Sequence, residues 1–357
     1  MAHLWHRRIG RAARVACLLA AWLAGGLYTE ARAQPPVVRY GSEVPPDVAL
    51  IYERGVRFLT TTQLDDGAWP GSYPSGSTGL CLLALLAGGE DPDFGPHSLH
   101  VRKAVRGIIR GQNADTGYIP NSMYCHGFGM LALAEAYGAV DETRLWEDEP
   151  PERERPSIGV ALERAVRCAV AAQHNNPFGG WRYLPSDNSA DTSVSGAVLV
   201  GLLAARNAGI EVPDQCIDRA LEYYRTSTSR DGTVAYSIGM GTMGASMNRS
   251  AIAALVFAIG KRQQWPEYQA TLGYLRTRLE HNETAYPFYF RYYMAQALFQ
   301  GDFESWSRWK LENVRVLKEL QQEDGSFEGG QGGAAYSTAL ALLSLAVEYR
   351  LLPIYER

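Results

Sequence analysis

The chain has 357 residues, enough for one large domain or two small ones. Apolar residues make up 46% of the sequence and charged residues 20%, which excludes a mainly disordered protein. The formal net charge is -4, and no cluster of Lys and Arg follows residue 33, so nucleic acid is an unsuitable partner.

The first 33 residues have the pattern of a cleaved signal peptide. Basic residues precede an apolar run over residues 15–28, and an Ala-Arg-Ala triplet ends at Ala33. The run is shorter than the roughly 20 residues of a membrane-spanning helix. We therefore expect cleavage near Ala33 and a secreted or periplasmic protein with no stable membrane anchor. Loss of five Arg and one Glu would take the net charge from -4 to about -8.

A repeated pattern, Gln-x3-Gly-x-aromatic, organises the rest of the chain. Its steps of 42 to 61 residues leave room for two helices in each unit. We interpret the aromatic residues as stacking on the loop and the Gln residues as capping the neighbouring helix, both structural roles. Four repeat positions carry the glutamine: Gln63, Gln112, Gln173 and Gln321. Thr228 and Leu279 stand at the other two. The clearest aromatic positions are Trp69, Trp181 and Phe327.

Two kinds of helix alternate along the chain. The first kind is amphipathic, as over residues 49–61, 158–172 and 217–224. After a loop rich in Gly, Asp, Pro and Tyr comes a nearly all-apolar helix, which must be buried. These apolar helices are expected over residues 79–87, 127–137, 194–205, 251–259 and 339–347.

This alternation predicts an all-α fold in which six helical hairpins form an inner and an outer ring, an α6/α6 toroid. The single toroid domain is expected over residues 47–357, after a tail over residues 34–46. We expect the inner helices to begin near Thr78, Tyr124, Asp191, Asn248, Arg291 and Ser337.

The Gln-x3-Gly-x-Trp units resemble the QW repeats of squalene-hopene and oxidosqualene cyclases. The resemblance extends from about residue 50 to the C-terminus. Protein prenyltransferase β subunits share the toroid of this prenyltransferase/squalene cyclase repeat family. The resemblance implies an α/α toroid with a central cavity, whereas function needs its own argument because one fold hosts many chemistries.

In such a toroid the inner helices all start at one end, so their first turns and the preceding loops line a common mouth. We take Asp191 and His126 as the candidate catalytic residues there. The candidate ligand-binding residues are Tyr73, Tyr124, Tyr183, Thr192, Asn248, Arg249, Arg291 and Tyr336.

Asp191 opens the third inner helix. The related cyclases protonate squalene with the middle acid of Asp-x-Asp-Asp-Thr-Ala, and aligning Thr192 with that motif places Ala190 at the acid position. Alanine cannot donate a proton, which argues against cyclisation by that mechanism. Asp191 is then expected to cap its helix.

His126 begins the second inner helix, so we expect it to face the same cavity as Asp191. A mutual hydrogen bond would raise the pKa of His126 and make it a proton carrier near neutral pH. Cys125, His126 and Asp191 also resemble the zinc ligands of the prenyltransferases. Adjacent residues point about 100° apart on a helix, however, and we favour a site without metal or cofactor.

The other cysteines after residue 33 are Cys81, Cys168 and Cys216. Their spacing matches no CxxC motif, which favours buried thiols and leaves disulfide pairing open.

The aromatic content is high, with 20 Tyr and 8 Trp, and an aromatic cluster over residues 286–293 precedes the predicted fifth inner helix. Our preferred hypothesis is a repeat protein that binds an apolar isoprenoid-like ligand, or a partner protein, in the central cavity. One alternative is an active prenyltransferase or cyclase with atypical acids. A second alternative is a carbohydrate-active envelope enzyme. Such an enzyme needs two opposed carboxylates, and only Asp191 and Asp187 are near the predicted mouth. A third alternative is a non-catalytic scaffold. The sequence leaves enzymatic activity open.

Overall fold

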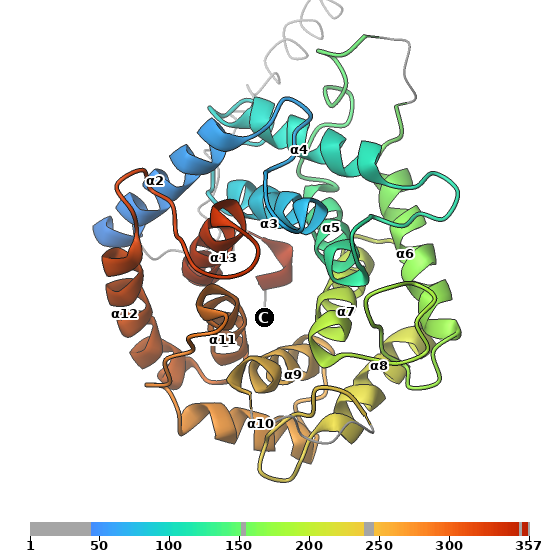
Figure 1. Ribbon diagram of the computed structural model, residues 1–357, viewed down its shortest axis with the longest axis vertical. Coiled ribbons are helices and arrows are strands. Elements are labelled where there is room, and N and C mark those ends of the chain that lie inside the picture. The colour runs from blue at the N-terminus through green and yellow to red at the C-terminus, as the bar shows by residue number, and fades with distance from the viewer. Residues whose placement is uncertain (1–43, 151–154, 239–245, 350–351, 356–357) are drawn as a thin grey trace, which may run out of the picture. The chain divides into compact units, whose positions relative to one another are not determined.

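Helices with a charged face alternate along the chain with helices that are apolar all round, and the two kinds form two concentric rings (Figure 1). The computed structural model describes residues 44–150, 155–238, 246–349 and 352–355, which belong to one compact unit, Ser42–Arg357. The predicted signal peptide (1–33) and most of the predicted tail (34–43) lie outside the described residues. Within these residues all regular structure is helical, which confirms the predicted all-α toroid.

The outer ring consists of the amphipathic helices. Their bounds are α2 (Pro46–Thr62), α4 (Ser98–Gly111), α6 (Ile158–His174), α8 (Asp214–Ser227), α10 (Pro266–Arg276) and α12 (Phe303–Leu320). The inner ring consists of the apolar helices. Their bounds are α3 (Pro74–Leu86), α5 (Met123–Ala136), α7 (Thr192–Asn207), α9 (Met247–Ile259), α11 (Pro287–Gly301) and α13 (Ala334–Ala346).

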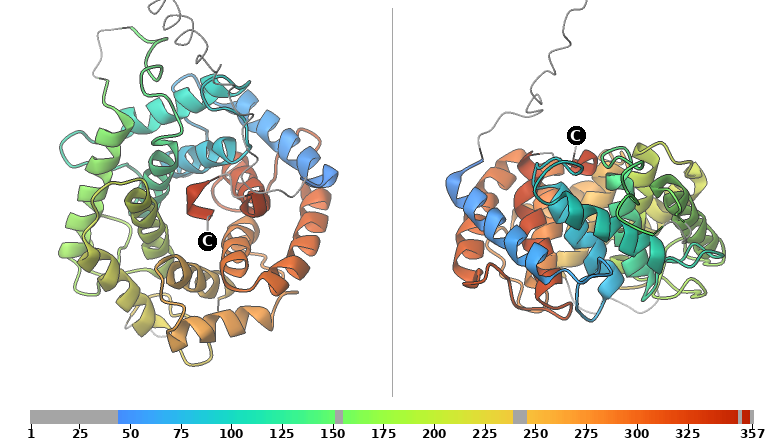
Figure 2. Two further views of the ribbon diagram at one scale, coloured as in Figure 1. Left: turned by 180° about the vertical axis from the view of Figure 1, so that it is seen from behind. Right: turned by 90° about the horizontal axis from the view of Figure 1, so that it is seen from above.

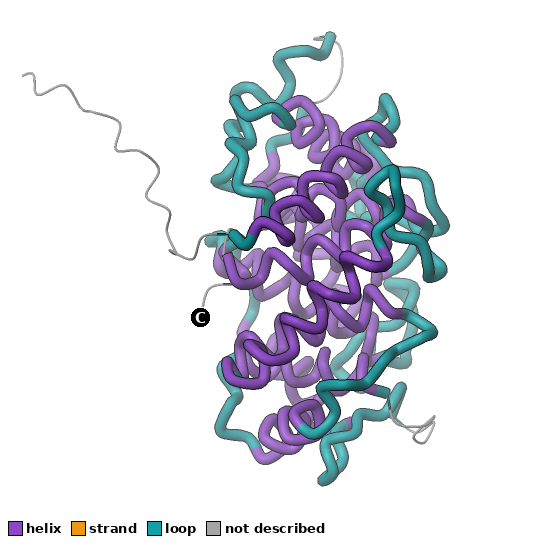
Figure 3. Tube along the Cα trace, turned by 90° about the vertical axis from the view of Figure 1, so that its left-hand side faces the viewer, coloured by secondary structure: helices purple, strands orange, loops and turns teal. Residues whose placement is uncertain are grey.

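The inner ring forms the core and closes on itself. Neighbouring inner helices pack against each other around the ring, and α13 packs against α3 (Figure 2). Every residue of α5 except Tyr124 is buried, as expected for a helix with no polar face. Figure 3 shows the helices packed side by side, with the loops at their ends. In the described part of the chain, no helix is both long and apolar enough to cross a membrane.

Three inner helices begin earlier than predicted, and one of them is α13, which begins at Ala334 rather than near Ser337. Helix α3 begins at Pro74 rather than near Thr78, and α11 begins at Pro287 rather than near Arg291. Proline has no N–H to donate, so it is well suited to the first helical position. The predicted aromatic cluster over residues 286–293 therefore lies mostly within the first turns of α11.

The repeat Gln residues join each outer-helix loop to the next outer helix. Nε2 of Gln63 donates to the carbonyl of Gly67 in its own loop (3.1 Å) and to that of His100 in α4 (3.0 Å). The same two bonds are made by Gln112 to Gly117 and Ala161, by Gln173 to Gly179 and Cys216, and by Gln321 to Gly325 and Ile51.

The repeat glycine is required by a close approach between backbones. Gly67 has a φ of 89°, and a Cβ there would lie 1.9 Å from the carbonyl oxygen of Lys103 in α4. A side chain at this position would meet both the strain of positive φ and a backbone clash. The repeat aromatics are buried beside these loops, and the indoles of Trp69 and Trp181 donate to the carbonyls of Leu59 and Ala169 (both 2.8 Å).

Candidate functional site

A pocket of about 510 Å³ lies at the end of the ring where the inner helices begin. The start of every inner helix, or the loop before it, contributes to its lining. The lining residues are Tyr73, Asn121, Ser122, Tyr124, Tyr183, Asp191, Ser193, Val194, Tyr236, Ser246, Asn248, Arg249, Tyr286, Tyr289, Gln331, Gly332 and Tyr336.

Tyrosines form the rim of the pocket. Tyr73 and Tyr286 each precede the proline that begins an inner helix, and they share nearly the same backbone conformation. Their side chains are exposed, as is that of Tyr183 in the loop before α7. The rim therefore offers aromatic faces to a ligand entering from solvent.

Deeper tyrosines are joined by hydrogen bonds. The hydroxyls of Tyr124 and Tyr336 lie 2.9 Å apart, and those of Tyr183 and Tyr236 lie 2.6 Å apart. Burial raises the pKa of Tyr124 and of Tyr336, and Tyr236 has its pKa raised by burial and by its hydrogen bond to Asp191. These phenols therefore keep their protons at neutral pH and can donate hydrogen bonds.

Asp191 caps α7 with one carboxylate oxygen and faces the pocket tyrosines with the other. Its Oδ1 accepts from the backbone N–H groups of Ser193 (2.7 Å) and Val194 (3.0 Å). The hydroxyl of Tyr183 donates to Oδ2 at 3.5 Å. Asp191 is thus a helix cap and a polar group of the pocket at once.

Arg249 supplies the opposite charge from the first turn of α9. Its Nε donates to the carbonyl of Val234 (2.8 Å). Burial lowers the pKa of Arg249, and the negative charge of nearby Asp191 opposes that shift. The positive and negative charges of the described lining residues are therefore balanced.

Asn248 contributes a buried acceptor without a partner. The residue is only 7% exposed, and its Oδ1 makes no hydrogen bond to any residue that the structure describes. An unpaired buried amide oxygen is costly enough to need a reason. Asn248 is also one of the residues that line the pocket.

Aromatic side chains fill the centre of the ring below the pocket. Helices α5 and α11 face each other across the inner ring (Figure 1). Tyr124 meets Tyr289 with ring centroids 6.0 Å apart, and Phe128 meets Tyr292 at 6.3 Å. Phe128 and Tyr292 are almost completely buried, so no open channel passes beside them.

Most of the predicted mouth residues line this pocket, but three do not. Those that do are Tyr73, Tyr124, Tyr183, Asp191, Asn248, Arg249 and Tyr336. Thr192 is buried and donates to the carbonyls of Ala235 (3.1 Å) and Tyr236 (3.3 Å), so it holds the loop that carries Tyr236. Arg291 points to the outer ring, where its guanidinium donates to Oδ1 of Asn313 in α12 (2.9 Å).

His126 also faces the outer ring, so the structure does not bring it to Asp191. The N–H of Ile119 donates to its Nδ1 (3.0 Å), and its Nε2 donates to the carbonyl of Ala165 in α6 (3.1 Å). The pKa of His126 is lowered to about 4, chiefly by burial. This direction is opposite to the one we predicted, because the expected carboxylate partner is absent and the ring is buried in its neutral form.

The suggested zinc ligands are not gathered in one place. In the described ranges, no three His, Cys, Asp or Glu side chains form a group that could hold a metal. Burial raises the pKa of the Cys125 thiol, which accepts a hydrogen bond from Ser122 (3.4 Å). Cys81, Cys125, Cys168 and Cys216 are free and buried.

Tyr236 and Tyr289 were not among the predicted site residues. Tyr236 lies two residues after Val234, and Tyr183 lies two residues after Trp181, at the corresponding place in its own repeat. Aligning the repeats beyond the aromatic position would have identified Tyr236. Tyr289 was seen only as one member of an aromatic cluster.

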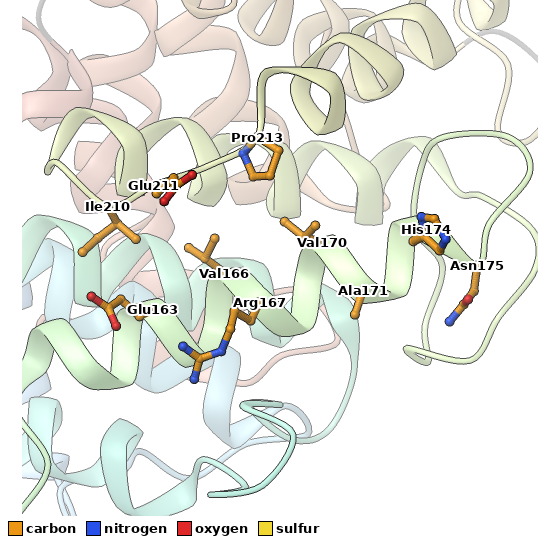
Figure 4. Close-up of a pocket in the computed structure, with 10 residues that line it drawn as sticks. All are labelled: Glu163, Val166, Arg167, Val170, Ala171, His174, Asn175, Ile210, Glu211 and Pro213. Carbon is orange, nitrogen blue, oxygen red and sulfur yellow. The ribbon is translucent and has the colours of Figure 1, made fainter.

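A larger hollow of about 860 Å³ lies on the outer ring, between α6 and residues 210–213 (Figure 4). Val166 and Val170 point from α6 toward this segment, while Arg167 points away from it. The hollow is lined by one outer helix and one loop, whereas the starts of all six inner helices contribute to the inner pocket, so we assign function to the inner pocket.

Comparisons with known proteins establish the fold. No model of a known protein family matches the chain, and no curated protein matches it. An inactive variant of the α-1,6-mannanase GH76A of Salegentibacter sp. HEL1_6, with two aspartates replaced and solved with α-1,6-mannotetrose, has a TM-score of 0.62 at 10% identity. That match covers 85% of this chain and 99% of the mannanase.

A variant of the type II terpene cyclase MstE from Scytonema, solved with geranylgeranyl dihydroxybenzoate, has a TM-score of 0.57 at 17% identity. This match covers 86% of the present chain and 98% of the cyclase. The chain therefore shares the α/α-toroid fold of enzymes with carbohydrate and terpene chemistry. At such low identity the likeness extends to the fold and not to the activity.

Proposed function

We propose that this protein binds a neutral oligosaccharide in the pocket at the starts of the inner helices, without cleaving it. The observation that carries the proposal is the chemistry of the lining. Val194 is the one aliphatic side chain among its described residues, which otherwise bear hydroxyl, amide or charged groups, apart from a glycine. An apolar isoprenoid would make no hydrogen bonds with those groups, whereas sugar hydroxyls can both donate to them and accept from them.

The rim and the charges support the same class of ligand. Exposed tyrosines combine a rigid aromatic face with a polar hydroxyl, a combination that suits the apolar faces and hydroxyl edges of sugar rings. The charges of Asp191 and Arg249 offset each other, which favours an uncharged ligand. The side-chain amide of Asn248, which lines the pocket, suits a ligand that carries hydroxyl groups.

The isoprenoid hypothesis has less support. A long prenyl chain needs a deep apolar cavity, but aromatic contacts between α5 and α11 occupy the centre of the ring. Ala190, at the position of the cyclase acid, is only 1% exposed and has no proton to donate.

Cleavage of the sugar also lacks support. Most glycosidases use two opposed carboxylates. Asp191 is the one carboxylate among the described lining residues, while Asp187 accepts from the N–H of Leu184 in its own loop. Binding to a cell-envelope saccharide agrees with the basic, then apolar start of the sequence, and we propose export on that ground.

A glycan array followed by calorimetry tests the proposal. Neutral mannose-, glucose- and N-acetylglucosamine-containing oligosaccharides are arrayed, and each binder is titrated beside geranylgeraniol as the apolar probe. We expect at least one neutral oligosaccharide to bind with a Kd of about 1 mM or tighter, and geranylgeraniol not to bind. No new reducing ends should appear on prolonged incubation.

Two Tyr→Phe variants distinguish the pocket from the rest of the protein. Tyr336→Phe removes the hydroxyl that pairs with Tyr124 in the pocket lining and should weaken sugar binding about tenfold. Tyr223→Phe is the control for loss of a tyrosine hydroxyl from the fold, because Tyr223 is buried on α8 and does not line the pocket. Binding of geranylgeraniol with no binding of any sugar would contradict the proposal.

A further inference from the structure

We infer that the pocket takes the end of a saccharide chain rather than its middle, an inference that rests on the proposed function. The first observation is the shape of the wall. The inner helices form a closed ring, and residues at the start of each one contribute to the lining. A polymer lying across a site needs a groove that is open on two sides, whereas the described residues line this pocket from the starts of all six inner helices.

The second observation is the floor. Tyr124 packs edge-on against Phe128, with ring centroids 4.8 Å apart, and Tyr289 packs against Tyr293 at the same distance. Phe128 and Tyr293 are 1% and 0% exposed. Because dense aromatic packing closes the space below the ligand, a chain entering at the rim cannot continue through the ring.

The third observation is the opposite face. After α13 the chain runs through a short helix, η1 (Val347–Tyr349), to a second, η2 (Pro353–Tyr355), which contacts α7. Figure 1 shows this segment near the centre of the ring, and Leu352 and Ile354 are buried there. The described residues thus leave the pocket one entrance, at the rim.

A pocket with one entrance and a closed floor admits a chain only by its end. A volume of about 510 Å³ is that of a site for a small ligand, so the terminal sugar units enter and the rest of the chain extends into solvent past Tyr73, Tyr183 and Tyr286. The protein would then recognise chain termini. Each polymer chain would bind as many protein molecules as it has ends of the recognised type.

Calorimetric stoichiometry against chain length tests this inference. The probes are size-fractionated linear α-1,6-mannan, α-1,4-glucan and β-1,4-glucan series, each from the trimer to chains of at least about 20 units, with cyclodextrins as α-1,4-glucans that have no ends. We expect one protein per chain at every length in the series that binds. A cyclodextrin should not bind even if the linear α-1,4-glucans do.

The outcomes separate the two proposals. A stoichiometry that rises with chain length would overturn recognition of chain ends and leave sugar binding intact. Binding of cyclodextrins comparable to that of linear α-1,4-glucans would have the same consequence. Failure of every linear series, together with a glycan array on which no neutral oligosaccharide binds, would overturn the proposed function and this inference with it.

Discussion

Asn248 should affect stability and binding in opposite directions. Its Oδ1 is buried and makes no hydrogen bond to the described residues, so Asn248→Leu, which keeps the approximate shape, should raise the free energy of unfolding by about 1 kcal/mol. The same substitution should weaken oligosaccharide binding about tenfold, because the pocket loses a hydrogen-bonding amide. Urea unfolding and calorimetry measure the two effects.

Asn313→Leu is the matched control for Asn248→Leu. Asn313 is also buried, but its Oδ1 accepts from Arg291 and its Nδ2 donates to Ser344. Its replacement should destabilise the protein, because a buried guanidinium loses a partner, and should leave sugar binding unchanged. If Asn248→Leu also lowered stability and left binding intact, Asn248 would be a structural residue.

His126 should make stability fall as the pH falls. Its pKa is about 4 in the folded protein against an ordinary value of 6.5, so below about pH 6.5 the unfolded chain binds a proton that the folded protein does not. Stability is therefore greatest above about pH 6.5 and declines toward about pH 4. The full effect is on the order of 3 kcal/mol.

The variant His126→Gln isolates this effect. Between about pH 6.5 and about pH 5 the wild type should lose about 1.5 kcal/mol more stability than the variant, measured by urea unfolding at each pH. Equal losses in the two proteins would show that His126 is charged or exposed in the folded state. Its assignment as a neutral histidine buried between α5 and α6 would then be wrong.

Two of the three predicted residues that do not line the pocket, His126 and Arg291, are displaced for one geometric reason. His126 follows the pocket residue Tyr124 by two positions, and Arg291 follows Tyr289 by two positions. Two residues span about 200° on an α-helix, so each points away from the pocket and toward the outer ring. The sequence predicted which helix starts meet. To predict which side of each helix faces the pocket, one inward-facing residue would have to be known as a reference.

Among the loop elements, the repeat glycines should be more sensitive than other glycines of positive φ. Gly67→Ala adds a Cβ that would lie 1.9 Å from a backbone oxygen of α4, whereas Gly138, with a φ of 85°, has open space around that position. We expect Gly138→Ala to cost about 1 kcal/mol, and Gly67→Ala to cost at least about 2 kcal/mol more, by urea unfolding. Equal costs would show that the loop moves away from α4 easily.

Trp181 tests whether the repeat aromatics serve the fold or the ligand. Its side chain is 2% exposed, its indole donates to Ala169, and it does not line the pocket. Trp181→Ala should cost about 3 to 5 kcal/mol in unfolding free energy, with sugar affinity unchanged under conditions where the variant is folded. A loss below about 1 kcal/mol with binding abolished would make Trp181 a ligand platform instead.

The helices were predictable because each kind carries its own signal. The all-apolar segments had to be buried and the amphipathic ones had to cover them, so the repeat led directly to two rings. The starts of α3 and α11 were placed too late because the apolar run, rather than the preceding Pro74 or Pro287, was taken as the first turn.

At the scale of the whole molecule, the sequence predicted the ring and its mouth but not what occupies its centre. Contacts such as Phe128 with Tyr292 join residues on opposite sides of the ring, and their approach depends on how closely all the inner helices pack. No local pattern encodes that distance. The expected isoprenoid cavity therefore came from resemblance, while the aromatic floor emerged only from the three-dimensional packing.

Native mass spectrometry of the protein purified from its own source tests the central claim most directly. The account predicts a co-purifying species whose mass fits a neutral oligosaccharide, released on denaturation and reduced in Asn248→Leu but not in Tyr223→Phe. A co-purifying polyisoprenoid lipid, retained in both variants, would contradict it.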